Sequence, residues 1–149
     1  MTILAPFDGS ELSVVSVDRA GEFASVRDER LVVLTVVPDD EAFAVERGWI
    51  DPGEELDTES VCAEFESVVC DIEPTATFRC ERAPRSESMT ATTVDDITRT
   101  VRRVAEELDV SVVFIGSDSA GLVSIGDGSV GEPLSTDPRY DVHIVRHAE

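Results

Sequence analysis

The fold class follows first from Leu31–Val37, seven residues that read LVVLTVV. An apolar run of this length without alternation is typical of a β-strand that is buried on both faces, as the strands of a parallel sheet are. Pro38 follows at once and ends the strand, because proline has no backbone N–H to donate to a neighbouring strand. This stretch therefore predicts a buried strand of a parallel α/β sheet.

Further helices and strands alternate on both sides of this run. A short apolar strand over Thr2–Phe7 precedes a helix over Ser10–Val26, and the acidic residues 38–56 are expected to form a long loop over the sheet. The elements predicted beyond residue 56 are a helix from Asp57 to Cys70, a strand over Thr75–Arg82, a helix from Val94 to Leu108, a strand over Val110–Ile115, a short helix near Val130–Leu134 and a last strand over Val142–Val145. This alternation predicts the α/β class: an open, doubly wound, five-stranded parallel sheet, Rossmann-like, with right-handed crossovers. The strand order that we expect for it is 3-2-1-4-5, in which the first and fourth strands are neighbours.

Length and composition narrow the class of protein further. The 149 residues suit a single domain over 1–149, and 42% of them are hydrophobic, which argues against a disordered chain. No apolar run approaches the roughly 20 residues that a membrane span needs, and no signal-peptide pattern opens the sequence, so we expect a cytoplasmic protein. Cys62, Cys70 and Cys80 show no CxxC spacing, which favours buried free thiols over a metal site or a redox pair.

The charge of the chain is strongly negative. Asp and Glu total 32 against 12 basic residues, all arginine, for a net charge of −20. At molar salt the Debye length falls to about 3 Å, so such a surface is tolerated there, and a halophilic-type protein of a salt-rich cytoplasm is the favoured interpretation. An ordinary acidic protein is the alternative, because arginine-only usage can also follow from genome composition. Nucleic acid and anionic membranes are disfavoured as partners.

Two predicted strands, the first and the fourth, run into small and flexible residues. The first is followed by Asp8-Gly9-Ser10, and the fourth by a segment from Gly116 to Ser129. A strand that leads through such residues into a helix start places backbone N–H groups beside an anionic ligand. In doubly wound sheets ligands bind beyond the carboxyl ends of the strands where the strand order reverses. The two segments are therefore expected to build one nucleotide site.

These segments resemble the hallmark motifs of the universal stress protein (UspA-like) family, whose sheet is adenine nucleotide alpha hydrolase-like. The family opens with strand-Pro-x-Asp-x-Ser, matched here by Pro6, Asp8 and Ser10, and the resemblance covers essentially the whole chain. In ATP-binding members the opening aspartate holds ribose or adenine. The resemblance therefore implies that role for Asp8, with Pro6 beside it and Val36 giving backbone contacts to adenine.

The late segment is similar to the family's Gly-x2-Gly-x9-Gly-Ser/Thr loop, which wraps the ribose and phosphates. The positions that the resemblance implies for ligand contacts are Ile115, Gly116, Ser119, Gly128, Ser129 and Val130. The loop departs from the pattern, because Ser119 stands where the family has its second glycine and eight residues, not nine, separate it from Gly128. Gly121 and Gly126 could supply the missing backbone freedom in a shifted register.

The late segment also lacks a cation. Between Arg103 and Arg139 the chain has no basic residue, and it carries Asp118, Asp127 and Glu132 instead. A helix dipole contributes only about 1 kcal/mol at an exposed end, so a triphosphate here would need Mg²⁺ or high salt. The expected ligand is an adenine nucleotide, either ATP with Mg²⁺ or a nucleotide of the AMP type.

Catalytic chemistries are disfavoured. A Walker A motif requires a lysine, and Asp127 stands where a nucleophile elbow needs its first glycine. His143 and His147 are interpreted as a sheet residue and a frayed terminus rather than as metal ligands. Because no general acid and base are suitably spaced, we expect no enzyme, with at most very slow ATP hydrolysis, no catalytic residues and no metal site.

Two classes of function remain open. The first is a nucleotide-binding stress-response regulator or sensor, in which ATP fixes a conformation. The second is a ligand-free member of the same fold that acts as a dimeric protein-interaction module, in which case Asp8 only caps the first helix and Gly116, Gly128 and Ser129 only shape turns. Both predict a homodimer, because Asp141–Arg146 reads as an edge strand with free backbone groups. The resemblance implies that this strand pairs across a two-fold axis.

Overall fold

The computed structural model describes residues 1–85, 92–118 and 139–148. In chain order its elements are β1 (Thr2–Pro6), α1 (Glu11–Arg27), β2 (Arg30–Pro38), α2 (Glu41–Glu46), α3 (Thr58–Ile72), β3 (Thr77–Ala83), α4 (Thr93–Glu107), β4 (Val110–Gly116) and β5 (Asp141–Val145). The predicted short helix near Val130–Leu134 lies outside the described residues. The other predicted elements are confirmed, with ends that differ by no more than two residues.

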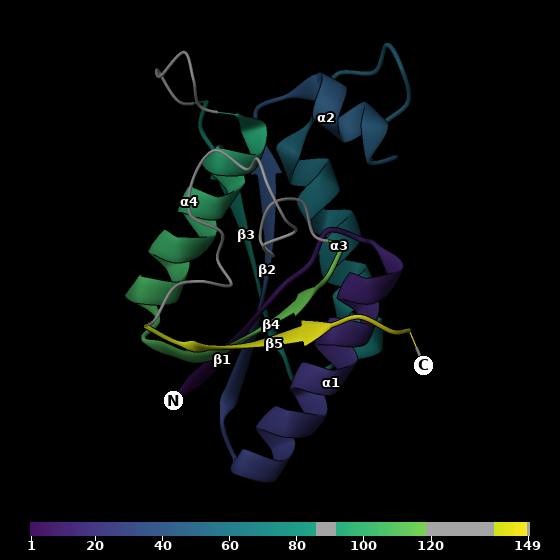
Figure 1. The fold of residues 1–149 in the computed structure, drawn as a ribbon. Coiled ribbons are helices and arrows are strands. Elements are labelled where there is room, and N and C mark those ends of the chain that lie inside the picture. The colour runs from purple at the N-terminus through teal and green to yellow at the C-terminus, as the bar shows by residue number, and fades with distance from the viewer. Residues whose placement is uncertain (86–91, 119–138, 149) are drawn as a thin grey trace.

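The strands form one parallel sheet in the order β3-β2-β1-β4-β5, which confirms the predicted fold class and strand order (Figure 1). The order reverses at β1, because the chain moves outward from β1 to β3 on one side and from β4 to β5 on the other. Pro6 ends β1 and Gly116 ends β4. Both residues therefore border the crevice in which such sheets bind ligands.

The LVVLTVV run contributes buried side chains to both hydrophobic layers. β2 lies between β1 and β3, and its residues 31–38 are all buried. Its alternate side chains serve opposite faces, as the pleat requires: Val32, Leu34 and Val36 pack in the layer of α4, and Leu31, Val33 and Val37 in the layer of α1 and α3. Figure 1 shows α4 on one side of the sheet and α1 and α3 on the other. Each fully buried Val or Leu contributes about 1.5–3 kcal/mol, so this strand stabilises both layers.

α1 begins directly after the turn that carries Asp8, and small polar residues fix its first turns. Ser10 is the N-cap, since its hydroxyl oxygen accepts a hydrogen bond from the Ser13 N–H at 3.3 Å. The hydroxyls of Ser13 and Ser16 donate to the backbone oxygens of Ser10 and Leu12, each at 2.8 Å. The two serines are therefore satisfied although they are buried, and they let the helix lie close to the sheet.

The expectation of a long loop over residues 38–56 is wrong in part, because this stretch contains α2. Asp40 caps the helix: one carboxylate oxygen accepts from the Phe43 N–H at 3.1 Å, and the other accepts from the Thr93 hydroxyl at 2.6 Å. These hydrogen bonds, that of Thr93 first, lower the pKa of the Asp40 carboxyl. Asp40 thus ties α2 to the start of α4. A six-residue helix is too short to show a period in the sequence.

The prediction of buried free thiols is also wrong. Cys62 on α3 and Cys80 on β3 form a disulfide, with Cα atoms 5.8 Å apart, and Cys70 is exposed. α3 packs beside β3, and this crossover brings together two cysteines that are 18 residues apart in the sequence. Their local spacing gives no sign of the pairing. The disulfide links α3 to the edge strand of the sheet.

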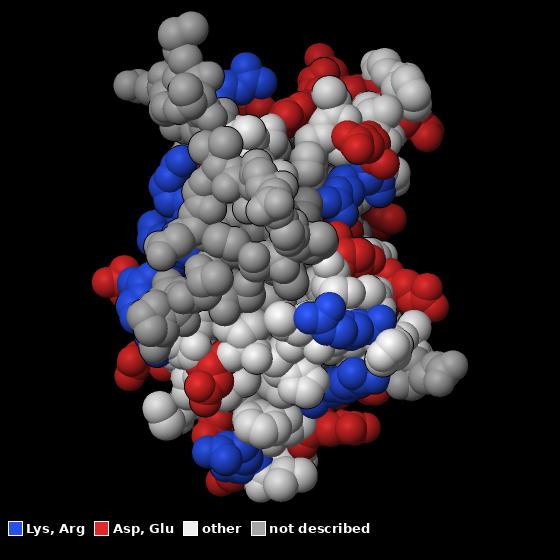
Figure 2. All heavy atoms as spheres, in the orientation of Figure 1, with Lys and Arg blue, Asp and Glu red and all other residues white. Residues whose placement is uncertain are grey.

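Acidic and arginine side chains are interspersed on the face shown in Figure 2. Arg79 pairs with Glu81 at 2.8 Å and with Glu107 at 2.7 Å, and Arg103 pairs with Glu81 at 3.1 Å. This network joins β3 to α4 and offsets part of the negative charge. Within the described ranges, no helix is long and apolar enough to cross a membrane.

Candidate functional site: a cavity at the end of the first strand

A small cavity lies beyond the carboxyl ends of β1 and β2, between α4 and the segment that contains α2. Its volume is about 40 Å³. The residues that line it are Pro6, Phe7, Asp8, Leu34, Val36, Phe43, Arg47, Trp49, Ile97 and Val101. The cavity thus brings together three of the residues that the sequence predicts as ligand contacts: Pro6, Asp8 and Val36.

Asp8 is held in place by three groups around the turn after β1. One carboxylate oxygen accepts a hydrogen bond from the Ser10 N–H at 2.9 Å, and the other lies 3.2 Å from an Arg47 guanidinium nitrogen. The Asp8 backbone oxygen accepts from the Trp49 indole N–H at 3.0 Å. Ser10, not Asp8, is the N-cap of α1. Helix capping therefore accounts only for the hydrogen bond of Asp8 with the Ser10 N–H and not for its contact with Arg47. Its carboxylate is positioned at the cavity and is 22% exposed.

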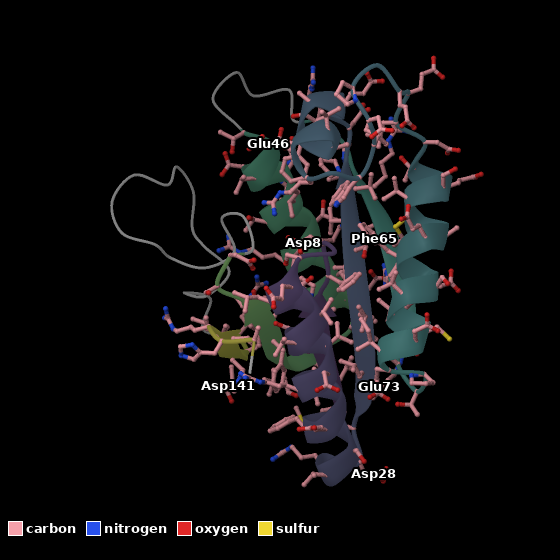
Figure 3. The ribbon with its side chains drawn as sticks, turned by 90° about the vertical axis from the view of Figure 1, so that its right-hand side faces the viewer. Asp8, Asp28, Glu46, Phe65, Glu73 and Asp141 are labelled. Atoms are coloured by element: carbon pink, nitrogen blue, oxygen red, sulfur yellow. A yellow bond between two sulfur atoms is a disulfide. The ribbon has the colours of Figure 1, made fainter. Side chains whose placement is uncertain are left out.

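The turn also requires Gly9. Its φ of +85° lies in the left-handed region, and a Cβ at this position would come within 3.0 Å of the Phe65 ring. Phe65 comes from α3, and Figure 3 shows it level with Asp8. Close approach of α3 therefore shapes the backbone on which Asp8 is presented.

Arg47 is a site residue that the sequence prediction missed. It follows α2, and its guanidinium lies over the Phe43 ring, 5.1 Å from the ring centre. The Trp49 ring makes edge contacts with Phe43 at 5.6 Å and with Phe65 at 5.5 Å between ring centres. This aromatic cluster holds the segment after α2 against the end of β1. The Phe43 and Arg47 spacing of four residues and the single tryptophan were the available signals.

The end of β4 supplies two further predicted residues, and packing accounts for both. Ile115 is fully buried in the layer of α4, which leaves its backbone for any ligand contact. A Cβ on Gly116 would lie 2.9 Å from the Leu12 Cβ and 3.2 Å from the Leu12 carbonyl carbon. Glycine is therefore needed here so that the end of β4 can approach the first turn of α1.

Asp118 connects the two predicted segments electrostatically. Burial raises the pKa of its carboxyl, and the negative charge of Asp8 raises it further, whereas Arg47 and a hydrogen bond with Ser10 act in the opposite direction. The ends of β1 and β4 therefore meet, as the sequence predicts. Their combined charge is negative, because two carboxylates face one guanidinium.

The remaining predicted contact residues, Ser119, Gly128, Ser129 and Val130, lie outside the described residues, as do Gly121, Gly126, Asp127 and Glu132. His143 is on β5 and stacks on the Phe114 ring at 4.7 Å between ring centres, in agreement with its interpretation as a sheet residue. Across residues 1–85, 92–118 and 139–148, no group of three or more His, Cys, Asp or Glu side chains could hold a metal ion.

Several solved structures share this fold. A universal stress protein in complex with cAMP is 19% identical, with a TM-score of 0.58 over 98% of this chain and 97% of that chain. A member of the family from Burkholderia pseudomallei is 20% identical, with a TM-score of 0.60 over 97% of this chain and 94% of that chain. A universal stress protein from Archaeoglobus fulgidus is 18% identical, with a TM-score of 0.56 over 98% of each chain. At such identities the likeness establishes the fold.

The family is established by sequence. A comparison with curated proteins found no match. A model of the universal stress protein family, in contrast, matches residues 1–146, nearly the whole chain. The match includes both strand ends, that of β1 with Asp8 and that of β4 with Gly116. The protein therefore belongs to the universal stress protein family.

Proposed function

We propose that this protein binds an adenine nucleotide, ATP or AMP, and acts as a stress-response regulator or sensor. The observation that carries the proposal is the position of Asp8, whose carboxylate lines a largely apolar cavity at the point where the strand order reverses. A carboxylate there can accept hydrogen bonds from ribose hydroxyls or from the adenine amino group. The similar protein that was solved with cAMP supports an adenine ligand.

Each predicted contact residue has a proposed role. Asp8 holds the ribose or adenine, Pro6 lies beside the base and the Val36 backbone contacts adenine. The ribose and phosphate contacts are assigned to the segment that follows β4: Ile115, Gly116, Ser119, Gly128, Ser129 and Val130. We propose that Mg²⁺ accompanies ATP, because Asp8 and Asp118 already place two carboxylates close together.

The cavity has to widen when the ligand binds. Its volume of about 40 Å³ has room for a few water molecules at roughly 10–15 Å³ each, whereas small-molecule sites measure about 300–1,000 Å³. Pro6, Leu34 and Val36 are buried in the sheet and cannot give way. Arg47 and Trp49 are only partly buried. The proposal therefore includes an outward shift of the segment after α2.

The remaining features of the proposal follow from the sequence. We propose that residues 1–149 form one domain, that binding changes conformation without dedicated catalysis, and that the protein works in a salt-rich cytoplasm. The net charge of −20 supports the high-salt setting and disfavours nucleic acid and membrane partners. The thiol state of Cys62 and Cys80 in cells tests the location, because disulfides are rare in the cytosol.

A dimeric interaction module is the second candidate function. It is favoured by Asp8 being already engaged by Arg47, and by β5, which forms the edge of the described sheet. An edge strand presents backbone groups that a second chain can pair with. We propose a homodimer through β5 for both candidates, so the dimer alone does not separate them.

Calorimetric titration with Mg-ATP in about 2 M KCl separates the two candidates, because this salt screens the acidic surface. The matched variants are Asp8→Ala and Asp39→Ala. Asp39 is an exposed carboxylate that pairs with Arg82 at 3.3 Å and does not line the cavity. Nucleotide binding predicts heat of binding that is lost in Asp8→Ala and kept in Asp39→Ala. No heat from folded wild-type dimer would leave the interaction module as the function.

A further inference from the structure

The cavity holds one positive and one negative side chain in direct contact. Among the described residues that line it, the charged ones are Asp8 and Arg47, and their side chains approach to 3.2 Å. The two side chains are 22% and 25% exposed, so water and salt screen the pair only in part. The guanidinium also lies over the Phe43 ring, which contributes a cation–π contact.

A ligand that uses the Asp8 carboxylate has to compete with this ion pair. The oxygen bound to Arg47 is one of the two on Asp8, and the other already accepts from the Ser10 N–H. A neutral nucleoside that takes the place of Arg47 removes the Asp8 partner of a partly desolvated guanidinium, which is unfavourable. The nearby Asp118 carboxyl is a poor substitute, because burial disfavours its charged form. A nucleotide brings its own anion, and the phosphate can replace the carboxylate as partner of the guanidinium.

We propose that Arg47 is the specificity-determining residue of this cavity and makes it select nucleoside phosphates over the neutral nucleoside. The inference rests on the proposed nucleotide-binding function and identifies the phosphate as the group that the site recognises. Arg47 releases Asp8 to the sugar or base, and its guanidinium pairs with the phosphate.

The surrounding charges show why this cation is needed. Asp118 lies close enough to Asp8 for the two carboxyl groups to affect each other, and the pKa of Asp118 is raised mainly by burial and then by Asp8. Without Arg47, a phosphate would meet two carboxylates and no described cation at this cavity. Arg47 thus supplies the positive charge that the late segment lacks.

The test compares adenosine with AMP, which differ by one phosphate, by calorimetry at a single KCl concentration. The variants are Arg47→Gln, Arg47→Lys and, as control, Arg82→Gln. Arg82 pairs with Asp39 but is exposed and does not line the cavity. Folding is checked by far-UV circular dichroism, and Arg47→Met, which keeps an apolar stem beside Phe43, replaces Arg47→Gln if the latter does not fold.

Wild-type protein is expected to bind AMP more tightly than adenosine. In Arg47→Gln this preference falls by about tenfold, the factor typical of one charge-assisted hydrogen bond, while adenosine binds at least as tightly as to wild type. Arg47→Lys keeps most of the preference because it keeps the charge, and Arg82→Gln keeps all of it.

Two results would overturn the inference. If Arg47→Gln binds AMP and adenosine with the wild-type ratio, or weakens both equally, Arg47 does not read the phosphate, although the cavity still binds nucleotide. If the wild-type protein binds neither compound, the proposed function itself fails, and the assignment of Arg47 fails with it.

Discussion

The disulfide between α3 and β3 has a consequence for stability that can be calculated from the chain. Cys62 and Cys80 close a loop of 18 residues. Closing a loop of this length lowers the conformational entropy of the unfolded chain, which adds about 3 kcal/mol to the free energy of unfolding. We therefore predict that the double variant Cys62→Ala/Cys80→Ala has a free energy of unfolding about 3 kcal/mol below that of the oxidised wild-type protein.

Urea unfolding followed by circular dichroism measures this difference. Each protein is unfolded with and without a thiol reductant, and reduction of the wild type is expected to give the stability of the double variant. Cys70→Ala is the matched control, because Cys70 is an exposed free cysteine that takes no part in the disulfide. An exposed substitution of this kind changes stability by no more than about 0.5 kcal/mol.

A thiol titration of the unfolded, unreduced protein decides the same question chemically. The structure predicts one reactive thiol, that of Cys70, out of the three cysteines. Three reactive thiols, together with a stability that does not respond to reductant, would refute the pairing and the loop-entropy reasoning.

Three further variants test the surroundings of the site. Gly116→Ala should lower the free energy of unfolding by about 1–3 kcal/mol in the same urea assay, because the added Cβ would lie 2.9 Å from the Leu12 Cβ. Gly21→Ala is the control and should not destabilise the protein, because its added Cβ would meet only the flexible end of the Glu73 side chain. Asp40→Ala should cost about 1 kcal/mol at neutral pH through loss of the α2 cap. The pKa of Asp40 is lowered in the folded state, so the stabilisation that its carboxylate gives is present above the reference pKa of 3.8 and is lost as the pH falls through the folded pKa. Thermal melts at a series of pH values should therefore show the difference between Asp40→Ala and the wild type disappearing in acid. A difference that persists in acid would contradict this. Asp118→Asn should raise the melting temperature at neutral pH, because folding raises the pKa of Asp118 and disfavours its charged form. This gain in melting temperature should vanish as the pH falls through the folded pKa of Asp118. A lower melting temperature of the variant at neutral pH would contradict the raised pKa.

Local sequence pattern was sufficient for the fold class. The LVVLTVV run of β2 is buried along its length, and alternating helices and strands indicate a parallel sheet with right-handed crossovers. The order 3-2-1-4-5 is one of several strand orders that this alternation allows. The position of Asp8 was also predictable, because it follows the first strand of the sheet at the reversal of strand order. These features depend on residues that are neighbours in the chain.

The parts that sequence reasoning missed depend on residues far apart. Arg47 reaches Asp8 across 39 positions, through a six-residue helix without a visible period. Cys62 and Cys80 meet only because α3 packs on β3. Gly116 has a role in packing against Leu12 that no loop motif indicates. Each of these contacts is set by how elements pack, which single-sequence periodicity does not report.

The most direct test of nucleotide binding at Asp8 uses the only tryptophan of the chain. Trp49 lines the cavity and donates a hydrogen bond to the Asp8 backbone oxygen, so a ligand that enters the cavity must change its surroundings. Titration with AMP, followed by Trp49 fluorescence, is predicted to give a saturable change in the wild-type protein and none in Asp8→Ala. An unchanged Trp49 spectrum in a folded wild-type protein, or an identical change in Asp8→Ala, would contradict the account.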